Sequence, residues 1–257
     1  MARTIITTCG TSLKTASAWE DQQCQNGLPL AKITDPEERH RMSGIYAGFT
    51  ARFRLPQDLA AQFDRQCWDD ISRLGKLSAE LASLRALAHY YEKAAQPPQP
   101  LGAGDRAIFL YSDNEAGRFC AHCIRIILET YQLLPGVALD FREIPGLDPR
   151  VPAAFQAALQ NLWSVCLTTA NNLPPGHRLI LNLTGGYKAM GLIPAALSTI
   201  VQLTPPPSIV YLHETAGPEQ LLIFSYDKKN RTIDQWLVAG FYEPTAAHVG
   251  PGIAWGL

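Results

Sequence analysis

The chain contains 257 residues, of which 47% are hydrophobic and 18% charged, and this balance excludes a disordered or fibrous protein. Its 22 basic and 23 acidic residues give a formal net charge of -1, which argues against binding of long nucleic acid over a broad basic surface. No apolar run is long enough to span a bilayer, and the N-terminus lacks the apolar core of a signal peptide. We therefore expect a cytoplasmic protein with no membrane partner.

Five apolar segments rich in β-branched residues are typical of buried strands. They cover residues 3–8, 106–112, 137–144, 178–184 and 208–213. Helical periodicity fills the intervals between them, and the expected helices cover residues 115–132, 152–171 and 187–203. Strands that alternate with helices predict a Rossmann-like α/β fold, with a mainly parallel sheet and helices on both faces.

Two regions depart from this simple alternation. Residues 57–95 have an apolar helical period, and we interpret residues 13–104 as a helical elaboration and linker after the first strand. Two apolar segments flank the polar residues 227–230 near the C-terminus, which predicts an antiparallel hairpin at one sheet edge. This hairpin belongs to a C-terminal β extension over residues 205–257, and residues 1–257 are expected to form a single domain.

Small polar residues gather where three of the expected strands end. In an open α/β sheet, ligands bind beyond the carboxyl ends of the strands, so these loops are the candidate ligand site. The residues are Cys9, Gly10, Thr11 and Ser12 after the first strand, Ser112 and Asn114 after the second, and Thr184, Gly185, Gly186, Tyr187 and Lys188 after the fourth.

The last of these loops carries the strongest chemical signal. Gly185 and Gly186 let the backbone approach a ligand closely, and the helix expected after them offers unpaired N–H groups that suit a phosphate. A cation in the first turn of a helix is disfavoured by the dipole, so Lys188 is better explained if it shares a bound phosphate. The alternative is a tight turn followed by a solvated lysine. The spacing does not match a P-loop.

The six cysteines are scattered through the chain, which indicates reduced thiols rather than a disulfide framework. Cys120, His122 and Cys123 lie close in sequence, but zinc needs about four ligands and no second Cys/His pair stands at a suitable spacing. We expect buried helix thiols here, and neither a metal nor a cofactor.

Three of the loop segments resemble the CARF family, the CRISPR-associated Rossmann-fold domains that bind cyclic oligoadenylates. They are residues 7–12, 112–117 and 182–189. Three further stretches resemble a stand-alone branch of that family, which includes the CRISPR ring nucleases. They are residues 78–84, 146–148 with Phe155 and Leu162, and residues 210–214. The resemblance runs in order from Ile5 to about Tyr226.

The resemblance implies roles for individual residues. Lys188 matches the lysine that contacts the scissile phosphate, and Ser12 matches the serine that positions the ribose 2′-hydroxyl or the phosphate. The matching ligand-contacting loop positions are Thr11, Asn114, Gly185 and Gly186. The resemblance also implies a homodimer with the ligand across its two-fold axis, so that each subunit meets the same chemical face.

The function implied is a metal-independent ring nuclease that cleaves a cyclic oligoadenylate, with cyclic tetra-adenylate favoured, and so ends type III CRISPR signalling. The ribose 2′-hydroxyl would attack its own 3′-phosphate and leave a 2′,3′-cyclic phosphate, which needs positioning and charge stabilisation. No general base is evident in the sequence, so we expect slow turnover. Two alternatives stay open: a sensor that binds without cleaving and acts through a partner protein, and an unrelated Rossmann-like enzyme for a nucleotide or sugar phosphate.

Overall fold

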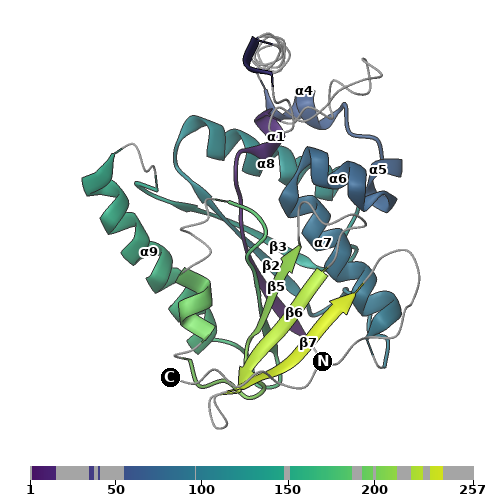
Figure 1. Ribbon diagram of the computed structural model, residues 1–257, viewed down its shortest axis with the longest axis vertical. Helices are drawn as coiled ribbons and strands as arrows, with labels where there is room; N and C mark the ends of the chain where they lie inside the picture. Colours follow the sequence, from purple (N-terminus) through teal and green to yellow (C-terminus); the bar gives the residue numbers. More distant parts are fainter. Residues whose placement is uncertain are drawn as a thin grey trace.

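The computed structural model describes residues 2–15, 35–37, 40, 55–95, 97–147, 151–186, 193–198, 201–212, 221–227 and 232–239. In this part of the chain, a seven-stranded sheet has helices on both faces, with α9 on one side and α6 and α7 on the other (Figure 1). The expected Rossmann-like α/β class is confirmed. No helix within these ranges is long and apolar enough to cross a bilayer.

Parallel pairing joins the first five strands of the sheet. They are β1 (Arg3–Thr8), β2 (Arg106–Ser112), β3 (Ala138–Ile144), β4 (Arg178–Asn182) and β5 (Ser208–Leu212). The strand order is β3-β2-β1-β4-β5-β6-β7, so the chain winds outward from β1 in both directions. The neighbours β1 and β4 therefore mark the switch point, where ligands bind in sheets of this kind.

The C-terminal hairpin is present as predicted. Strand β6 (Leu221–Asp227) pairs antiparallel with β5, and β7 (Thr232–Ala239) pairs antiparallel with β6 and is last in the strand order. Strands β6 and β7 pair antiparallel because the connection between them is short, whereas a parallel pair would need a long crossover.

On one face of the sheet, several helices share a core that includes Ile5, Leu81, Phe109 and Ile124, and α7 and α8 are the ones that pack on the strands. The helices described on this face are α1 (Ser12–Thr15), α4 (Pro56–Ala60), α5 (Gln66–Asp69), α6 (Ile71–Leu77), α7 (Ala79–His89), the π-helical turn η2 (Tyr90–Ala94) and α8 (Glu115–Thr130).

The apolar period of residues 57–95 is thus helical as expected, but it is divided into short helices. Two polar residues set the boundaries between α5 and α6 and between α6 and α7. The Asp70 carboxylate accepts a hydrogen bond from Arg73 N at 3.0 Å, and the Ser78 hydroxyl accepts one from Leu81 N at 3.3 Å. Each side chain caps a new helix and so ends the previous one. Of the expected elaboration before residue 55, most lies outside the described residues.

On the opposite face, α9 (Pro152–Asn171) covers the sheet and has the bounds predicted for it. Its core contacts include Leu162 and Cys166, which pack with Ile6, Ile108 and Leu181 of the sheet. The helix expected over residues 187–203 is described as helical over 193–198, and residues 201–203 lie outside it. Strand β4 ends at Asn182, two residues earlier than predicted.

Candidate ligand-binding site

The loops that follow β1 and β4 meet at the switch point of the sheet. Because Thr7 pairs with Asn182 in register, the two strands end side by side and their loops lie in contact. The Thr8 hydroxyl donates a hydrogen bond to the Gly185 carbonyl, and a Cβ on Gly10 would lie 3.0 Å from Gly186 N. The structure therefore brings together two of the three loops on which the sequence places the ligand.

The two glycines after β4 are required by this packing. A Cβ on Gly185 would lie 2.5 Å from both the Thr8 carbonyl oxygen and Glu80 Oε1, closer than real contacts allow. Gly186 has φ +83°, a conformation that side chains other than glycine rarely adopt. The tight-turn interpretation is thus correct for both glycines, and it is compatible with close approach of a ligand.

A carboxylate that the sequence analysis did not single out lies beneath the first loop. Glu80 is only 1% exposed, and its Oε1 accepts a hydrogen bond from Gly10 N at 2.6 Å. Its Oε2 accepts hydrogen bonds from the Ser78 hydroxyl at 2.7 Å and from the Ser12 hydroxyl at 3.3 Å. Three donors offset the desolvation of this charge, which also lies in the first turn of α7, where the helix dipole favours an anion.

In this arrangement the Ser12 hydroxyl is the donor and the Glu80 carboxylate is the acceptor. When the Ser12 hydroxyl donates its hydrogen to Glu80, its oxygen lone pairs become acceptors for a hydroxyl of a bound ligand. A serine held in this way can take a proton from a ligand hydroxyl and pass its own proton to the carboxylate. The group of Ser12, Ser78 and Glu80, together with the Gly10 amide, is called the Glu80 cluster below.

A buried polar network supports the two loops from below. Asn182 Nδ2 donates hydrogen bonds to Thr7 Oγ1 at 3.1 Å and to Ser83 Oγ at 2.8 Å, and its Oδ1 accepts one from Thr184 N at 3.2 Å. The Thr184 hydroxyl accepts a hydrogen bond from Leu212 N at 2.9 Å. This hydrogen bond joins Thr184 to β5 and so fixes the loop after β4.

The loop after β2 reaches the same end of the sheet, but its predicted ligand residues make structural contacts. The Asn114 side chain caps α8 by accepting a hydrogen bond from Gly117 N at 2.8 Å. Ser112 is buried against Gly117, where an added Cβ would lie 2.2 Å from the serine hydroxyl. Both side chains thus fix the start of α8.

The remaining predicted site residues differ in what the structure says of them. Cys9 is buried in the core, where desolvation, followed by the charge of Glu80, raises the pKa of its thiol well above the usual value. Its side chain packs with the core and stays neutral. Thr11 lies in the described loop after β1. Tyr187 and Lys188, which the sequence also places in the site, lie outside the described residues.

Cys120 and Cys123 are fully buried in α8, as expected for packing thiols. Burial raises the pKa of Cys123, and the neighbouring Cys120 raises it further, so neither oxidation chemistry nor metal binding is favoured there. Within the described ranges, no group of three His, Cys, Asp or Glu side chains is placed to hold a metal ion.

One comparison with known proteins gives a match. The model of a protein family described as CRISPR-associated protein (Cas_APE2256) matches residues 75–220, which is more than half of the chain. The matched region begins shortly before Glu80 and includes the loops after β2 and β4. No curated protein matches this chain.

Proposed function

Because this chain belongs to the CRISPR-associated protein family Cas_APE2256, we propose that it is a ring nuclease that binds a cyclic oligoadenylate and cleaves it without a metal ion. Cyclic tetra-adenylate is the favoured ligand, and its removal would end type III CRISPR signalling. The observation that carries the proposal is the Glu80 cluster, which lies where the loops after β1 and β4 meet.

The proposed reaction is attack by a ribose 2′-oxygen on the adjacent phosphorus. The 2′-hydroxyl proton passes to the Ser12 oxygen while the Ser12 proton passes to Glu80, over the contact of 3.3 Å seen in the structure. A new bond forms between the 2′-oxygen and phosphorus, and the bond from phosphorus to the 5′-oxygen breaks. The 5′-oxygen takes a proton from water, and Glu80 gives its proton to the hydroxide that this leaves. The product carries a 2′,3′-cyclic phosphate.

The Glu80 cluster supplies the proton acceptor that is not evident from the sequence. General base assistance through a positioned side chain typically accelerates such a step by about 10²–10⁴-fold. Lys188 follows Gly186 by two residues in the chain. In this proposal it neutralises the negative charge that builds on the phosphate oxygens in the transition state.

The experiment that tests the function is incubation of the protein with cyclic tetra-adenylate in the presence of a chelator, followed by chromatography and mass spectrometry. Linear oligoadenylates that end in a 2′,3′-cyclic phosphate are expected. Tight binding with no cleavage would instead identify a sensor that acts through a partner protein. Absence of both binding and cleavage would favour an unrelated nucleotide or sugar phosphate enzyme.

A further inference from the structure

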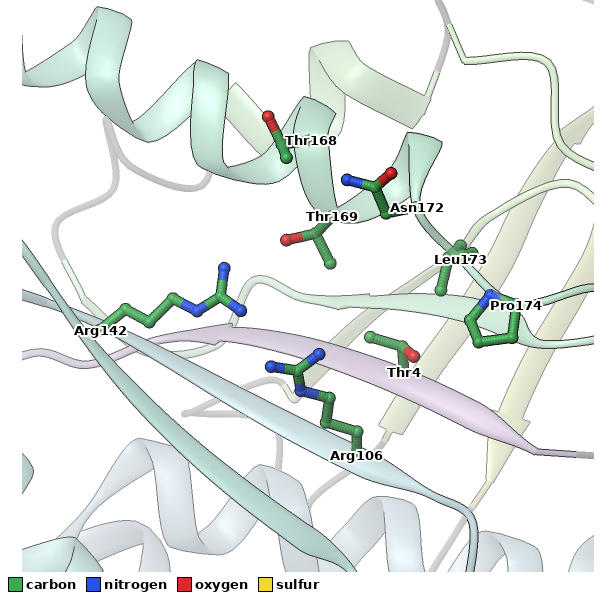
Figure 2. Close-up of a pocket in the computed structure, with 8 residues that line it drawn as sticks. All are labelled: Thr4, Arg106, Arg142, Thr168, Thr169, Asn172, Leu173 and Pro174. Atoms are coloured by element: carbon green, nitrogen blue, oxygen red, sulfur yellow. The ribbon is translucent and has the colours of Figure 1, made fainter.

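A pocket of about 200 Å³ lies on the α9 face of the sheet, away from the loops described above. Figure 2 shows it between the C-terminal end of α9 and the strands β1, β2 and β3. Its walls are formed by Thr4, Arg106, Arg142, Thr168, Thr169, Asn172, Leu173 and Pro174. None of these residues belongs to the Glu80 cluster or to the loop after β4.

Two arginines from neighbouring strands give this pocket its charge. In Figure 2 the side chains of Arg106 and Arg142 extend into the space beneath Thr169. Both guanidinium groups donate to a single carboxylate oxygen, Asp140 Oδ2: Arg142 does so through Nε at 2.9 Å and Nη2 at 2.8 Å, and Arg106 through Nη2. Two positive groups thus share one negative group, and an excess positive charge remains.

Asp140 also keeps the two guanidinium groups in place. Partial burial acts to raise its pKa, but the hydrogen bonds from Arg142 and Arg106 outweigh that effect and hold its pKa below the usual value. The carboxylate is therefore ionised at neutral pH and orients both arginines. Each guanidinium has five N–H donors, so one acceptor oxygen leaves further donors for a second anion.

The opposite wall offers neutral polar groups. Thr168, Thr169 and Asn172 come from the last turn and the C-terminal cap of α9. The Thr169 hydroxyl donates to the Val165 carbonyl at 2.8 Å, so its oxygen keeps lone pairs that can accept from a ligand hydroxyl. Leu173 gives this wall an apolar edge.

We propose that this pocket binds a phosphate monoester that carries a sugar-sized group. The phosphate lies against Arg106 and Arg142, because its three terminal oxygens can accept from two guanidinium forks at once. The sugar hydroxyls face the hydroxyl and amide groups at the end of α9. The volume is below the roughly 300–1,000 Å³ of pockets for drug-sized ligands, so it fits a sugar phosphate better than a whole cyclic oligonucleotide.

Calorimetric titration with ribose 5-phosphate tests this proposal, with orthophosphate, ribose and AMP as comparison ligands. Ribose 5-phosphate is expected to bind more tightly than orthophosphate, and ribose alone should give no binding. AMP carries the same ribose phosphate, so tighter binding of AMP than of ribose 5-phosphate would indicate a nucleotide as the natural source. Absence of binding by both phosphate esters at millimolar concentration would overturn the proposal.

The substitution Arg142→Gln is expected to weaken the binding of ribose 5-phosphate at least tenfold. Arg118→Gln is the matched control, because Arg118 also pairs with a β3 carboxylate, Glu143, but does not line the pocket. Equal losses in the two variants, or no loss in Arg142→Gln, would show that the ligand binds elsewhere.

A second measurement uses the unmodified protein and so does not depend on the folding of a variant. Amide chemical shifts in a titration with ribose 5-phosphate should change at residues 168–173 and around Arg106 and Arg142. Changes confined to residues 9–12 and 184–186 would place the phosphate in the Glu80 cluster region and overturn the second site. Because the pocket lies outside that region, the result is independent of the proposed nuclease activity.

Discussion

Glu80 places a negative charge beneath a loop that is expected to bind an anion. Such a charge would repel a phosphate, yet the structure surrounds it with the Gly10 amide and the hydroxyls of Ser12 and Ser78. The three donors direct the carboxylate oxygens away from solvent and toward the chain. At the scale of single residues, these contacts fit the role proposed for Glu80, which is to hold Ser12 and to accept its proton.

Replacement of Glu80 by glutamine removes the negative charge of this side chain and keeps its size. The glutamine carbonyl oxygen can still accept from the Gly10 amide, but its amide nitrogen cannot accept from the Ser12 or Ser78 hydroxyl. We expect single-turnover cleavage of cyclic tetra-adenylate to fall about a hundredfold, while binding changes little. Glu129→Gln, which alters an exposed carboxylate of α8, is the control and should cleave normally. An unchanged rate in Glu80→Gln would remove Glu80 from the mechanism.

Lys188 is expected to act on the transition state. Only interactions that are stronger there than in the bound ligand raise the chemical rate. Lys188→Ala should therefore lower single-turnover cleavage by about a hundredfold or more, with a much smaller effect on binding, because amides at Gly185 and Gly186 remain. Ser12→Ala should show the same separation with a smaller loss, and chelator should change neither rate. A parental rate for Lys188→Ala under saturating ligand would favour the sensor.

The buried thiols of α8 are expected to be structural. Changing Cys120 and Cys123 together to serine puts two hydroxyls into an apolar core, which costs about 1–3 kcal/mol of unfolding free energy for each hydroxyl left without a partner. Turnover of the folded protein should nevertheless stay within a few fold of the parental value. Stoichiometric zinc in protein purified without added metal, measured by atomic emission, would contradict this assignment.

At the scale of elements, the start of α7 does two things at once. Ser78 ends α6 and begins α7, because its hydroxyl accepts a hydrogen bond from Leu81 N. The same hydroxyl donates to Glu80, which bonds to the Gly10 amide of the loop after β1. The helix boundary and the candidate site are therefore built from the same side chains.

Two N-caps of adjacent helices provide a matched pair for testing this link. Ser78→Ala and Asp70→Ala each remove one capping side chain, and Asp70→Ala should lower the free energy of unfolding by about 1 kcal/mol in denaturant titrations. The loss in Ser78→Ala should be larger, because it also removes a hydrogen bond to the buried Glu80 carboxylate. Only Ser78 contacts Glu80, so only Ser78→Ala should also slow cleavage. Equal cleavage rates in the two variants would show that the Ser78 contact does not serve the reaction.

At the scale of the whole molecule, we expect a homodimer in which two loop regions face each other across the two-fold axis. This expectation is based on the small polar loops that gather at one end of the sheet, around the switch point between β1 and β4. A cyclic ligand with matching symmetry would then present the same chemical face to each subunit. Light scattering should give twice the chain mass, and a strict monomer with and without cyclic tetra-adenylate would contradict the prediction.

Much of the fold is determined by local sequence pattern. The β-branched run of β1 is buried over its whole length, and α9 has the bounds that its apolar period and initial Pro152 indicate. The polar residues 227–230 between two apolar segments specify the hairpin of β6 and β7 in the same way. These features follow from neighbours in the chain, because side-chain periodicity and turn chemistry act over a few residues.

The loops of the candidate site were also evident in the sequence, but the roles of several of their side chains were not. Asn114 and Thr184 are of residue types that often contact ligands, and in the structure the Asn114 side chain caps α8 and the Thr184 hydroxyl anchors the loop after β4. Small polar side chains serve both purposes equally well, so composition cannot distinguish a ligand contact from a cap.

Only the tertiary structure decided which distant residues meet. Glu80 stands in an ordinary helical pattern, and it becomes part of a site because α7 brings it 2.6 Å from Gly10 N. Likewise, Arg106 pairs with Asp140 beside the second pocket, because β2 and β3 pair in a parallel register that sets Arg106 opposite Ala138. The physical reason is the same in both cases: burial of apolar faces fixes the packing and register of the elements, and polar side chains far apart in sequence are brought together as a consequence.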